Sequence, residues 1–267
     1  MFLADYHTHT LVSPDSQASI YDMAAAASAA GLRELCVTDH CDLLSLEGER
    51  QLTFDWGPSL AQFDEAEFFA DPNLVLRLGL ELGSAHVCPE AARNILDRPG
   101  LDFVIGSLHN RSEAAGGGDY YCVEYSTPQV CRDILDDYFT NMEALVRLPD
   151  CYDVLGHIIY PLRYMVRDGQ SVSLEHCYGR LRAIFRAAVE SGRGIEFNTW
   201  CGRTVEEWRP VLALYREAGG EIVTTGSDAH APENVGKGLA DACGLLRDMG
   251  FRYLTTYKGR KPAFVKL

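Results

Sequence analysis

The feature that most constrains the fold of this chain is a short apolar run of strand length that recurs along it. The first run, residues 2–4, leads into the polar residues 5–9, and the later runs cover residues 35–38, 74–82, 103–108, 154–156, 195–198 and 222–225. Helix-length segments separate most of them, and short strands alternating with helices predict βα units and a parallel sheet. Because the alternation shows no reversal and no linker interrupts it, we predict one α/β domain over residues 1–267, closed into a barrel of seven strands.

The segments between the strands carry local signals for helices and loops. Residues 19–22 and 204–207 both have the capping-box pattern, which predicts a helix start at each. Residues 128–148 have the apolar spacing of a long amphipathic helix. We expect a mobile, glycine-rich loop over residues 110–127 and a terminal hairpin over residues 253–267.

Six of the predicted strands end in side chains that can bind a metal ion. In chain order, these are His7, His9, His40, Glu81, His109, His157, Asp228 and His230. In a parallel barrel, the carboxyl ends of all strands meet at one rim. A single histidine at a strand end is usually an ordinary polar residue with a hydrogen-bond partner. A repeated set gathered in one cleft without metal would place like charges and unpaired polar groups together.

Two sequence features strengthen the interpretation of these side chains as metal ligands. Asp5, His7 and His9 alternate along one predicted strand and therefore share a face. Glu81 lies within the apolar run 76–82, where a lone buried carboxylate would be unfavourable unless it bridges cations. Imidazole nitrogens and carboxylate oxygens suit zinc, iron and manganese, so the sequence leaves the metal open. Cys41 is a further possible ligand, although a bystander role is favoured.

The composition excludes several classes of function. The formal net charge of -14 and the pI near 4.9 argue against a nucleic-acid surface, but they allow a phosphorylated substrate bound through metals. The nine cysteines form no framework spacing, which indicates reduced thiols and a cytoplasmic location. The most apolar stretch, residues 23–32, is too short to span a membrane, and no secretory signal pattern opens the chain.

The ordered motifs resemble those of the PHP (polymerase and histidinol phosphatase) superfamily. They comprise Asp5-x-His7-x-His9, Asp15, Thr38-Asp39-His40, Glu81, His109, Gly156-His157 and residues 226–230 with Asp228 and His230. The resemblance covers nearly the whole chain. Residues 103–109 and 195–199, together with the chain length, resemble the histidinol-phosphate phosphatase branch of that superfamily.

This resemblance implies a distorted seven-stranded (β/α)7 TIM-like barrel that holds three divalent metal ions. One metal would take His7, His9, Glu81 and Asp228; a second would take Glu81, His109 and His157; the third would take Asp15, His40 and His230. Glu81 would bridge the first two. For Asp5 and Asp39, two roles stay open, namely orientation of neighbouring imidazoles and simple capping of loops.

Clustered metals make phosphoester hydrolysis the expected chemistry, through in-line attack of a metal-bridging hydroxide. Glu81 would act as the bridge, with Asp15, His230 or a metal-bound water as the general acid. Arg163 and Arg203 follow strands and are expected to bind the phosphate, although a surface ion pair is the alternative for each. Arg111 is a weaker candidate.

The loop over residues 110–121 could close over the substrate, and Glu113 or Asp119 could meet a cationic amine. The leading prediction is a phosphatase for L-histidinol phosphate in histidine biosynthesis. The alternatives are a phosphoesterase for another small ester such as a nucleotide, and a non-catalytic metal-binding module. A proofreading exonuclease is disfavoured by the acidity. The oligomeric state cannot be read from the sequence.

Overall fold

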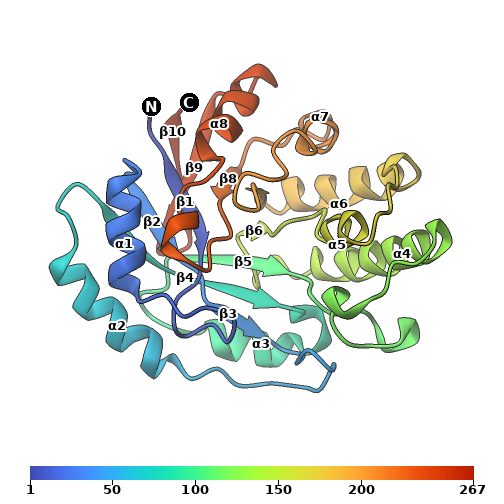
Figure 1. Ribbon diagram of the computed structural model, residues 1–267, viewed down its shortest axis with the longest axis horizontal. Helices are drawn as coiled ribbons and strands as arrows, with labels where there is room; N and C mark the ends of the chain where they lie inside the picture. Colours follow the sequence, from blue (N-terminus) through green and yellow to red (C-terminus); the bar gives the residue numbers. More distant parts are fainter.

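The computed structural model describes residues 1–267 apart from the side chain of Phe69. Seven parallel strands neighbour one another in chain order and form a nearly closed barrel (Figure 1). They are β1 (Ala4–Thr8), β2 (Glu34–Val37), β4 (Val75–Gly83), β5 (Phe103–Ser107), β6 (Val154–Leu155), β7 (Gly194–Asn198) and β8 (Val223–Gly226). The predicted seven-stranded barrel is therefore confirmed. A short extra strand, β3 (His40–Asp42), pairs with β4 and was not predicted.

β1 and β8 form no regular ladder, and the barrel closes at their carboxyl ends through a single bridge between Thr8 and Ala229. The amide of His9 donates to the carbonyl of Ala229 at 2.9 Å, and the amide of Asp228 donates to the carbonyl of His7 at 2.9 Å. These bonds place the metal-binding residues of the first and last strands side by side. The closure of the barrel therefore brings the candidate ligands that follow β1 and β8 into one site.

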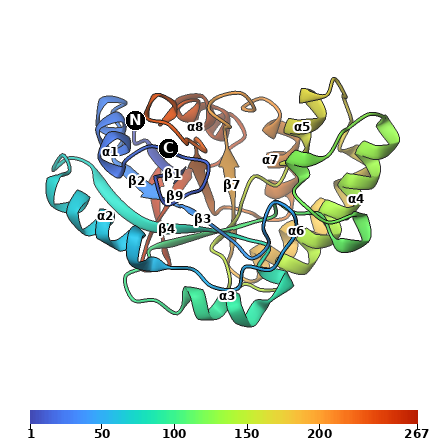
Figure 2. The same cartoon turned by 60° about the horizontal axis from the view of Figure 1, so that its bottom comes forward.

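The terminal hairpin, β9 (Tyr253–Lys258) with β10 (Lys261–Lys266), covers the open part of the seam. The amide of Tyr257 donates to the hydroxyl of Tyr6 in β1 at 2.8 Å, and the amide of Val223 in β8 donates to the hydroxyl of Thr255 at 3.2 Å. The predicted hairpin is confirmed, and its contacts with both β1 and β8 account for the distortion of the barrel. The N- and C-termini consequently lie close together in both views (Figures 1 and 2).

Helices surround the barrel (Figure 2). They are α1 (Ile20–Ala29), α2 (Trp56–Phe69), α3 (Pro89–Leu96), α4 (Pro128–Leu145), α5 (Pro161–Arg167), α6 (Tyr178–Glu190), α7 (Trp208–Glu217) and α8 (Leu239–Asp248). The cap predicted at Ser19 is confirmed, because its hydroxyl accepts from the amide of Asp22 at 3.1 Å. The cap predicted at Thr204 is wrong. That hydroxyl donates to the carbonyl of Asn198, and α7 begins only at Trp208.

One helix, α5, was not predicted from the sequence and lies at the rim of the barrel after β6. Pro161 occupies its first turn, a position where the missing amide hydrogen is not needed. The helix follows directly after His157 and carries Arg163. The guanidinium therefore projects from a helix rather than from a flexible loop.

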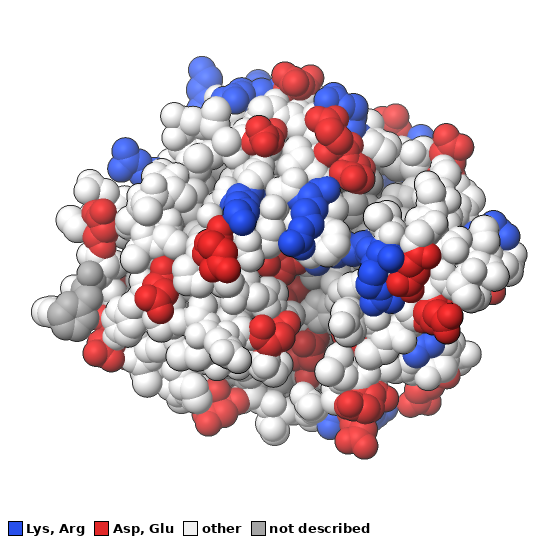
Figure 3. Space-filling view, in the orientation of Figure 1, with Lys and Arg blue, Asp and Glu red and all other residues white. Residues whose placement is uncertain are grey.

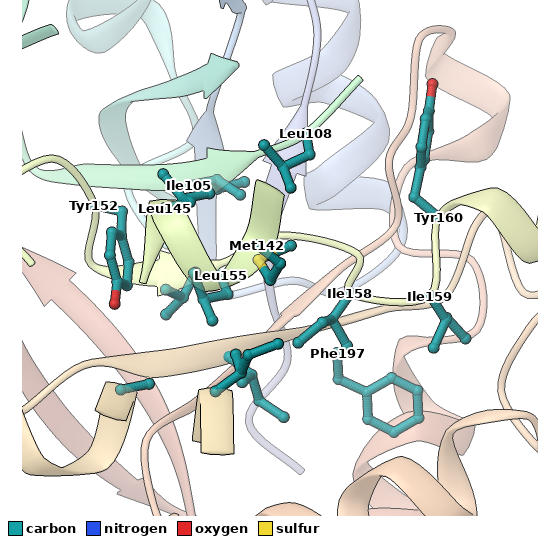
Figure 4. Close-up of a cluster of buried hydrophobic side chains, with 14 of the residues drawn as sticks. Ile105, Leu108, Met142, Leu145, Tyr152, Leu155, Ile158, Ile159, Tyr160 and Phe197 are labelled. Atoms are coloured by element: carbon teal, nitrogen blue, oxygen red, sulfur yellow. The ribbon is translucent and has the colours of Figure 1, made fainter. Parts of the chain in front are cut away.

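The main core lies between the barrel and the outer helices. Figure 4 shows Ile105, Leu155 and Phe197 from three neighbouring strands, with Met142 and Leu145 of α4 in the same cluster. All five side chains are fully buried. Among the described residues, no helix combines the length and the apolar character needed to cross a membrane.

Candidate metal centre

The carboxyl ends of the strands surround a cavity of about 260 Å³. Its wall includes most of the predicted ligands, namely Asp15, His40, Glu81, His109, His157, Asp228 and His230. His7 and His9 are fully buried and contact the same carboxylates. In Figure 3, acidic side chains lie in a hollow near the middle of the face and basic side chains border it. The structure therefore brings all nine predicted ligands together.

Glu81 lies at the centre of this group and is fully buried. One oxygen, Oε2, lies 3.1 Å from His7 Nε2, 3.5 Å from His9 Nε2 and 3.0 Å from His40 Nδ1. The other, Oε1, lies 2.8 Å from His157 Nε2 and 3.3 Å from His109 Nε2. A carboxylate with imidazoles on both oxygens has the arrangement that a bridging ligand requires.

Several buried polar atoms in the centre have no hydrogen-bond partner among the described residues. They include His7 Nε2, His9 Nε2 and Glu81 Oε2. Leaving such atoms unpaired is unfavourable, and native proteins rarely do so without a ligand or ion. The ligand atoms of these three residues all lie within 4.8 Å of one another. The donor set therefore fits a divalent cation.

Three further groups of ligand atoms in the centre share the same close spacing. They are Glu81, His109 and His157; His9, His40 and His230; and His40, Asp42 and His109. Asp15 lies beside the second of these, since its Oδ2 lies 3.1 Å from His230 Nε2 and 3.6 Å from His40 Nε2. The group around His7 and the first two of these correspond to the three-metal arrangement expected from the sequence, except that His9 also belongs to the group expected to contain Asp15.

Asp228 completes the first group at a looser distance. Its Oδ1 lies 3.6 Å from His7 Nε2 and 3.7 Å from His9 Nε2. Its backbone has a φ of 61°, in the left-handed region that few non-glycine residues adopt. The turn at this residue therefore carries strain of the kind found at functional sites.

The charges of the centre suit cation binding. Burial alone would raise the pKa of Glu81, but the neighbouring His7, His40 and His109 outweigh it and hold that pKa well below its ordinary value. Burial, together with the nearby His40 and His230, holds the pKa of His9 well below its ordinary value. These directions favour an ionised Glu81 and a neutral His9, the forms that bind a metal. Despite burial, nearby carboxylates raise the pKa of His7, His40 and His109 well above its ordinary value, so a cation binding there would displace a proton from each ring.

Glu196 of β7 is a functional residue that sequence reasoning missed. Its Oε1 lies 2.5 Å from His7 Nδ1, and its Oε2 accepts from the amide of His157 at 2.8 Å. A side chain at Gly226 would place a Cβ 2.4 Å from both Glu196 Oε1 and His7 Cβ. Glycine is needed there for this contact. A signal existed, because Glu196 is an acid within an apolar strand, as Glu81 is.

Asp42 was also missed, because strand β3 was not predicted. Its Oδ1 lies 2.7 Å from His109 Nδ1, and its Oδ2 lies 3.5 Å from His40 Nδ1. Alternation along β3 puts His40 and Asp42 on one face and Cys41 on the other. Cys41 is buried in the hydrophobic core, so the bystander interpretation of this thiol is supported.

Of the two roles left open, loop capping describes the contacts of Asp5, whereas Asp39 both caps a loop and reaches an imidazole through one hydroxyl. Asp5 accepts from the amides of Ser227 and Gly236, both at 2.9 Å. Asp39 accepts from the amide of Thr10 and from the hydroxyl of Ser13. Neither carboxylate hydrogen-bonds an imidazole directly among the described residues. Asp39 acts on His9 only through Ser13, whose hydroxyl lies 3.0 Å from His9 Nδ1.

The two predicted phosphate-binding arginines both line the cavity. Arg163 is buried, with Nη1 2.7 Å from Asp228 Oδ2 and Nη2 donating to Asn198 Oδ1 at 2.6 Å. Arg203 is exposed, and no carboxylate of the described residues pairs with it. Arg203 is therefore the cation free to meet an anion.

The other candidates lie outside the cavity wall. Arg111 donates to the carbonyl of Ala115 within its own loop, and Glu113 is exposed there. Asp119 accepts from the amide of Tyr121 at 2.6 Å. The loop pairs with the segment before α2, where the amide of Asp119 donates to the carbonyl of Leu46 at 2.9 Å. Closure of this loop over a substrate stays a prediction.

Comparison with known proteins places the chain in a family. Residues 5–200 match the PHP domain. A probable histidinol-phosphatase of Deinococcus radiodurans is 30% identical over 97% of this chain and 98% of its own length. A probable phosphatase of Photobacterium profundum is 51% identical over 88% of this chain and 81% of its own length.

A solved structure shares the whole fold. The histidinol phosphate phosphatase of Lactococcus lactis, complexed with zinc, L-histidinol and phosphate, superposes with a TM-score of 0.84 at 23% identity. The match covers 98% of each chain, which confirms the distorted barrel. The domain match and the sequence relatives together show that this chain belongs to the PHP family.

Proposed function

We propose that this chain is a metal-dependent phosphatase that hydrolyses L-histidinol phosphate to L-histidinol and phosphate, a step of histidine biosynthesis. The observation that carries the proposal is the convergence of three unpaired buried atoms, His7 Nε2, His9 Nε2 and Glu81 Oε2. They adjoin a cavity whose wall also contains two arginines. Metal ligands beside guanidinium groups are what a phosphate ester requires.

The residues present would hold three divalent ions, with zinc, iron and manganese all compatible with the donor set. The first ion would use His7, His9, Glu81 and Asp228; the second Glu81, His109 and His157; the third Asp15, His40 and His230. Such ions, when bound, activate water near neutral pH and stabilise negative charge on phosphoryl oxygens.

The chain's own side chains orient the reacting groups. Glu196 and Asp42 fix the rings of His7 and His109 by bonding their Nδ1 atoms. Arg203 is free to donate to the phosphoryl oxygens, and Arg163 is held at the cavity by Asp228. Asp15 and His230 lie 3.1 Å apart at the rim of the cavity. As ligands of the third ion they would carry no proton to give, so the leaving-group oxygen would take its proton from water at that site.

The choice of L-histidinol phosphate is supported by the relatives. The Deinococcus radiodurans protein is named a probable histidinol-phosphatase, and the Lactococcus lactis enzyme is complexed with L-histidinol and phosphate. The Photobacterium profundum protein is named only a probable phosphatase, which keeps another small phosphate ester, such as a nucleotide, as the second candidate.

A phosphate-release assay over a small panel of esters tests the proposal. The zinc-, iron- or manganese-loaded protein should release phosphate from L-histidinol phosphate with a kcat/KM well above that for nucleoside monophosphates and sugar phosphates. Comparable or lower values for L-histidinol phosphate would transfer the proposal to the second candidate.

We also propose that residues 1–267 act as one phosphoesterase domain in the cytoplasm, without a nucleic-acid or membrane partner. All nine cysteines are free thiols in the structure, as expected for a reducing compartment. The net charge of -14 disfavours a nucleic-acid surface.

A further inference from the structure

Trp200, on the turn after β7, has an unusual backbone for its residue type. Its φ is 45°, and that of the next residue, Cys201, is 54°. Bulky side chains seldom adopt this left-handed region, because their Cβ crowds the neighbouring carbonyl. Such strain persists only where the surroundings hold it, and it gathers at functional sites. Neither the sequence prediction nor the proposed function uses this residue.

Specific hydrogen bonds hold the strained turn in place. The amide of Trp200 donates to Asn198 Oδ1 at 2.8 Å, and the amide of Cys201 donates to the carbonyl of Ser227 at 2.7 Å. The turn is thereby fastened to the ends of both β7 and β8. As a result, the indole of Trp200 forms part of the cavity wall.

The indole contacts both candidate phosphate-binding arginines. The guanidinium carbon of Arg163 lies 5.2 Å from the ring centroid, and that of Arg203 lies 4.9 Å from it. Both distances are within the range of a cation–π interaction, for which indole is the best aromatic partner. One ring therefore contacts both cations of the cavity.

The two arginines depend on this ring to different degrees. Arg163 also bonds Asp228 and Asn198 and lies over the ring of Tyr160. The exposed Arg203 has, among the described residues, no side-chain hydrogen bond or ion pair, and Trp200 is the ring that it stacks on. An arginine side chain loses much rotamer freedom when ordered, so an unsupported one binds an anion less well.

We propose that Trp200 is a positioning residue whose indole holds the Arg203 guanidinium ready for the phosphate group of the substrate. The inference rests on the proposed phosphatase function and adds to it the side chain that holds the phosphate-binding Arg203 in place. The strained backbone places the indole ring in the cavity wall. The ring, and not the turn that carries it, is therefore the part that acts on Arg203.

Binding of inorganic phosphate to the zinc-loaded protein, measured by calorimetry, tests this role. Trp200→Ala removes the cation–π contact and should weaken phosphate binding by roughly three- to thirtyfold. Arg203→Ala removes the guanidinium itself and should weaken phosphate binding at least as much. The double variant should bind no more weakly than Arg203→Ala alone, because the ring acts through that arginine. Additive losses, or an unchanged Kd in Trp200→Ala, would overturn the proposal.

Two more variants separate the ring from the backbone. Trp200→Phe keeps an aromatic face and should retain most of the affinity for phosphate. Glycine adopts a positive φ without strain, so Trp200→Gly should fold at least as stably as Trp200→Ala. It should nevertheless bind phosphate as weakly as Trp200→Ala. Wild-type affinity in Trp200→Gly would contradict the proposal, since it would show that the ring is dispensable.

A second arginine–tryptophan stack gives a matched control. Arg98 lies 5.2 Å from the ring centroid of Trp56, outside the cavity wall. Trp56→Ala removes the same indole away from the cavity and should leave both phosphate binding and zinc content unchanged. Inorganic phosphate is the product released from every phosphate monoester. This test can therefore succeed or fail independently of whether L-histidinol phosphate is the substrate.

Discussion

Glu81 shows how one residue can link burial to chemistry. It is fully buried, and its two oxygens face five imidazoles from four strand ends. Water cannot solvate it, so its charge must be balanced by cations. Glu81→Gln keeps the shape and removes the charge. We expect it to lose metal and phosphatase activity together, by at least a hundredfold in kcat.

Elemental analysis beside the activity assay checks this expectation. Glu90→Gln, at an exposed position on α3, is the matched control and should keep both properties. Full metal content in Glu81→Gln would contradict the bridging role.

Glu196 makes a second prediction at the same scale. It orients the His7 ring through Nδ1, and partners of this kind typically account for a tenfold to hundredfold change in metal affinity. Glu196→Gln should therefore raise the Kd for zinc by about that factor, measured by competition with a chelating dye. The exposed Glu190→Gln on α6 removes the same charge elsewhere and should leave the Kd unaltered. Equal zinc affinity in both variants would exclude the orienting role.

At the scale of elements, local sequence predicted strands better than helix starts. Each strand is an apolar run that is buried in the barrel, so its pattern reflects its environment. The capping pattern was right at Ser19 and wrong at Thr204, where the hydroxyl bonds Asn198 instead. Strand β3 and helix α5 were missed because each is short and depends on neighbours, β4 in the first case.

The confirmed cap gives a prediction for α1. Ser19→Ala removes the acceptor for the amide of Asp22 and should lower the free energy of unfolding by about 1 kcal/mol. Chemical denaturation measures this, and the KM for the substrate should not move. The exposed Ser126→Ala is the control and should change stability by less than about 0.5 kcal/mol. Equal stability of the two variants would show that the cap contributes nothing.

At the scale of the whole molecule, the metal centre joins strands from all around the barrel. Ions that bind only the folded state stabilise it, by about 2.7 kcal/mol for each site at a hundredfold excess over Kd. Removal of metal by a chelator should lower Tm by roughly 5 to 10 °C per site and abolish phosphatase activity. Addition of zinc or manganese should restore both. Phosphatase activity that survives complete metal removal would contradict the metal-dependent mechanism. A lowered Tm on metal removal, with no phosphatase activity even in the metal-loaded protein, would favour a non-catalytic metal-binding module.

The sequence by itself determined the barrel class and the candidate metal ligands, because strand periodicity and the chemistry of His, Asp and Glu are local properties. Only the tertiary structure decided which atoms meet. Glu196 and Asp42 acquire their roles through His7 and His109, which lie far away in the chain, and Trp200 joins the nearby Arg203 to the more distant Arg163. The closing of the barrel creates these long-range contacts, so a local sequence pattern cannot specify the atoms that meet.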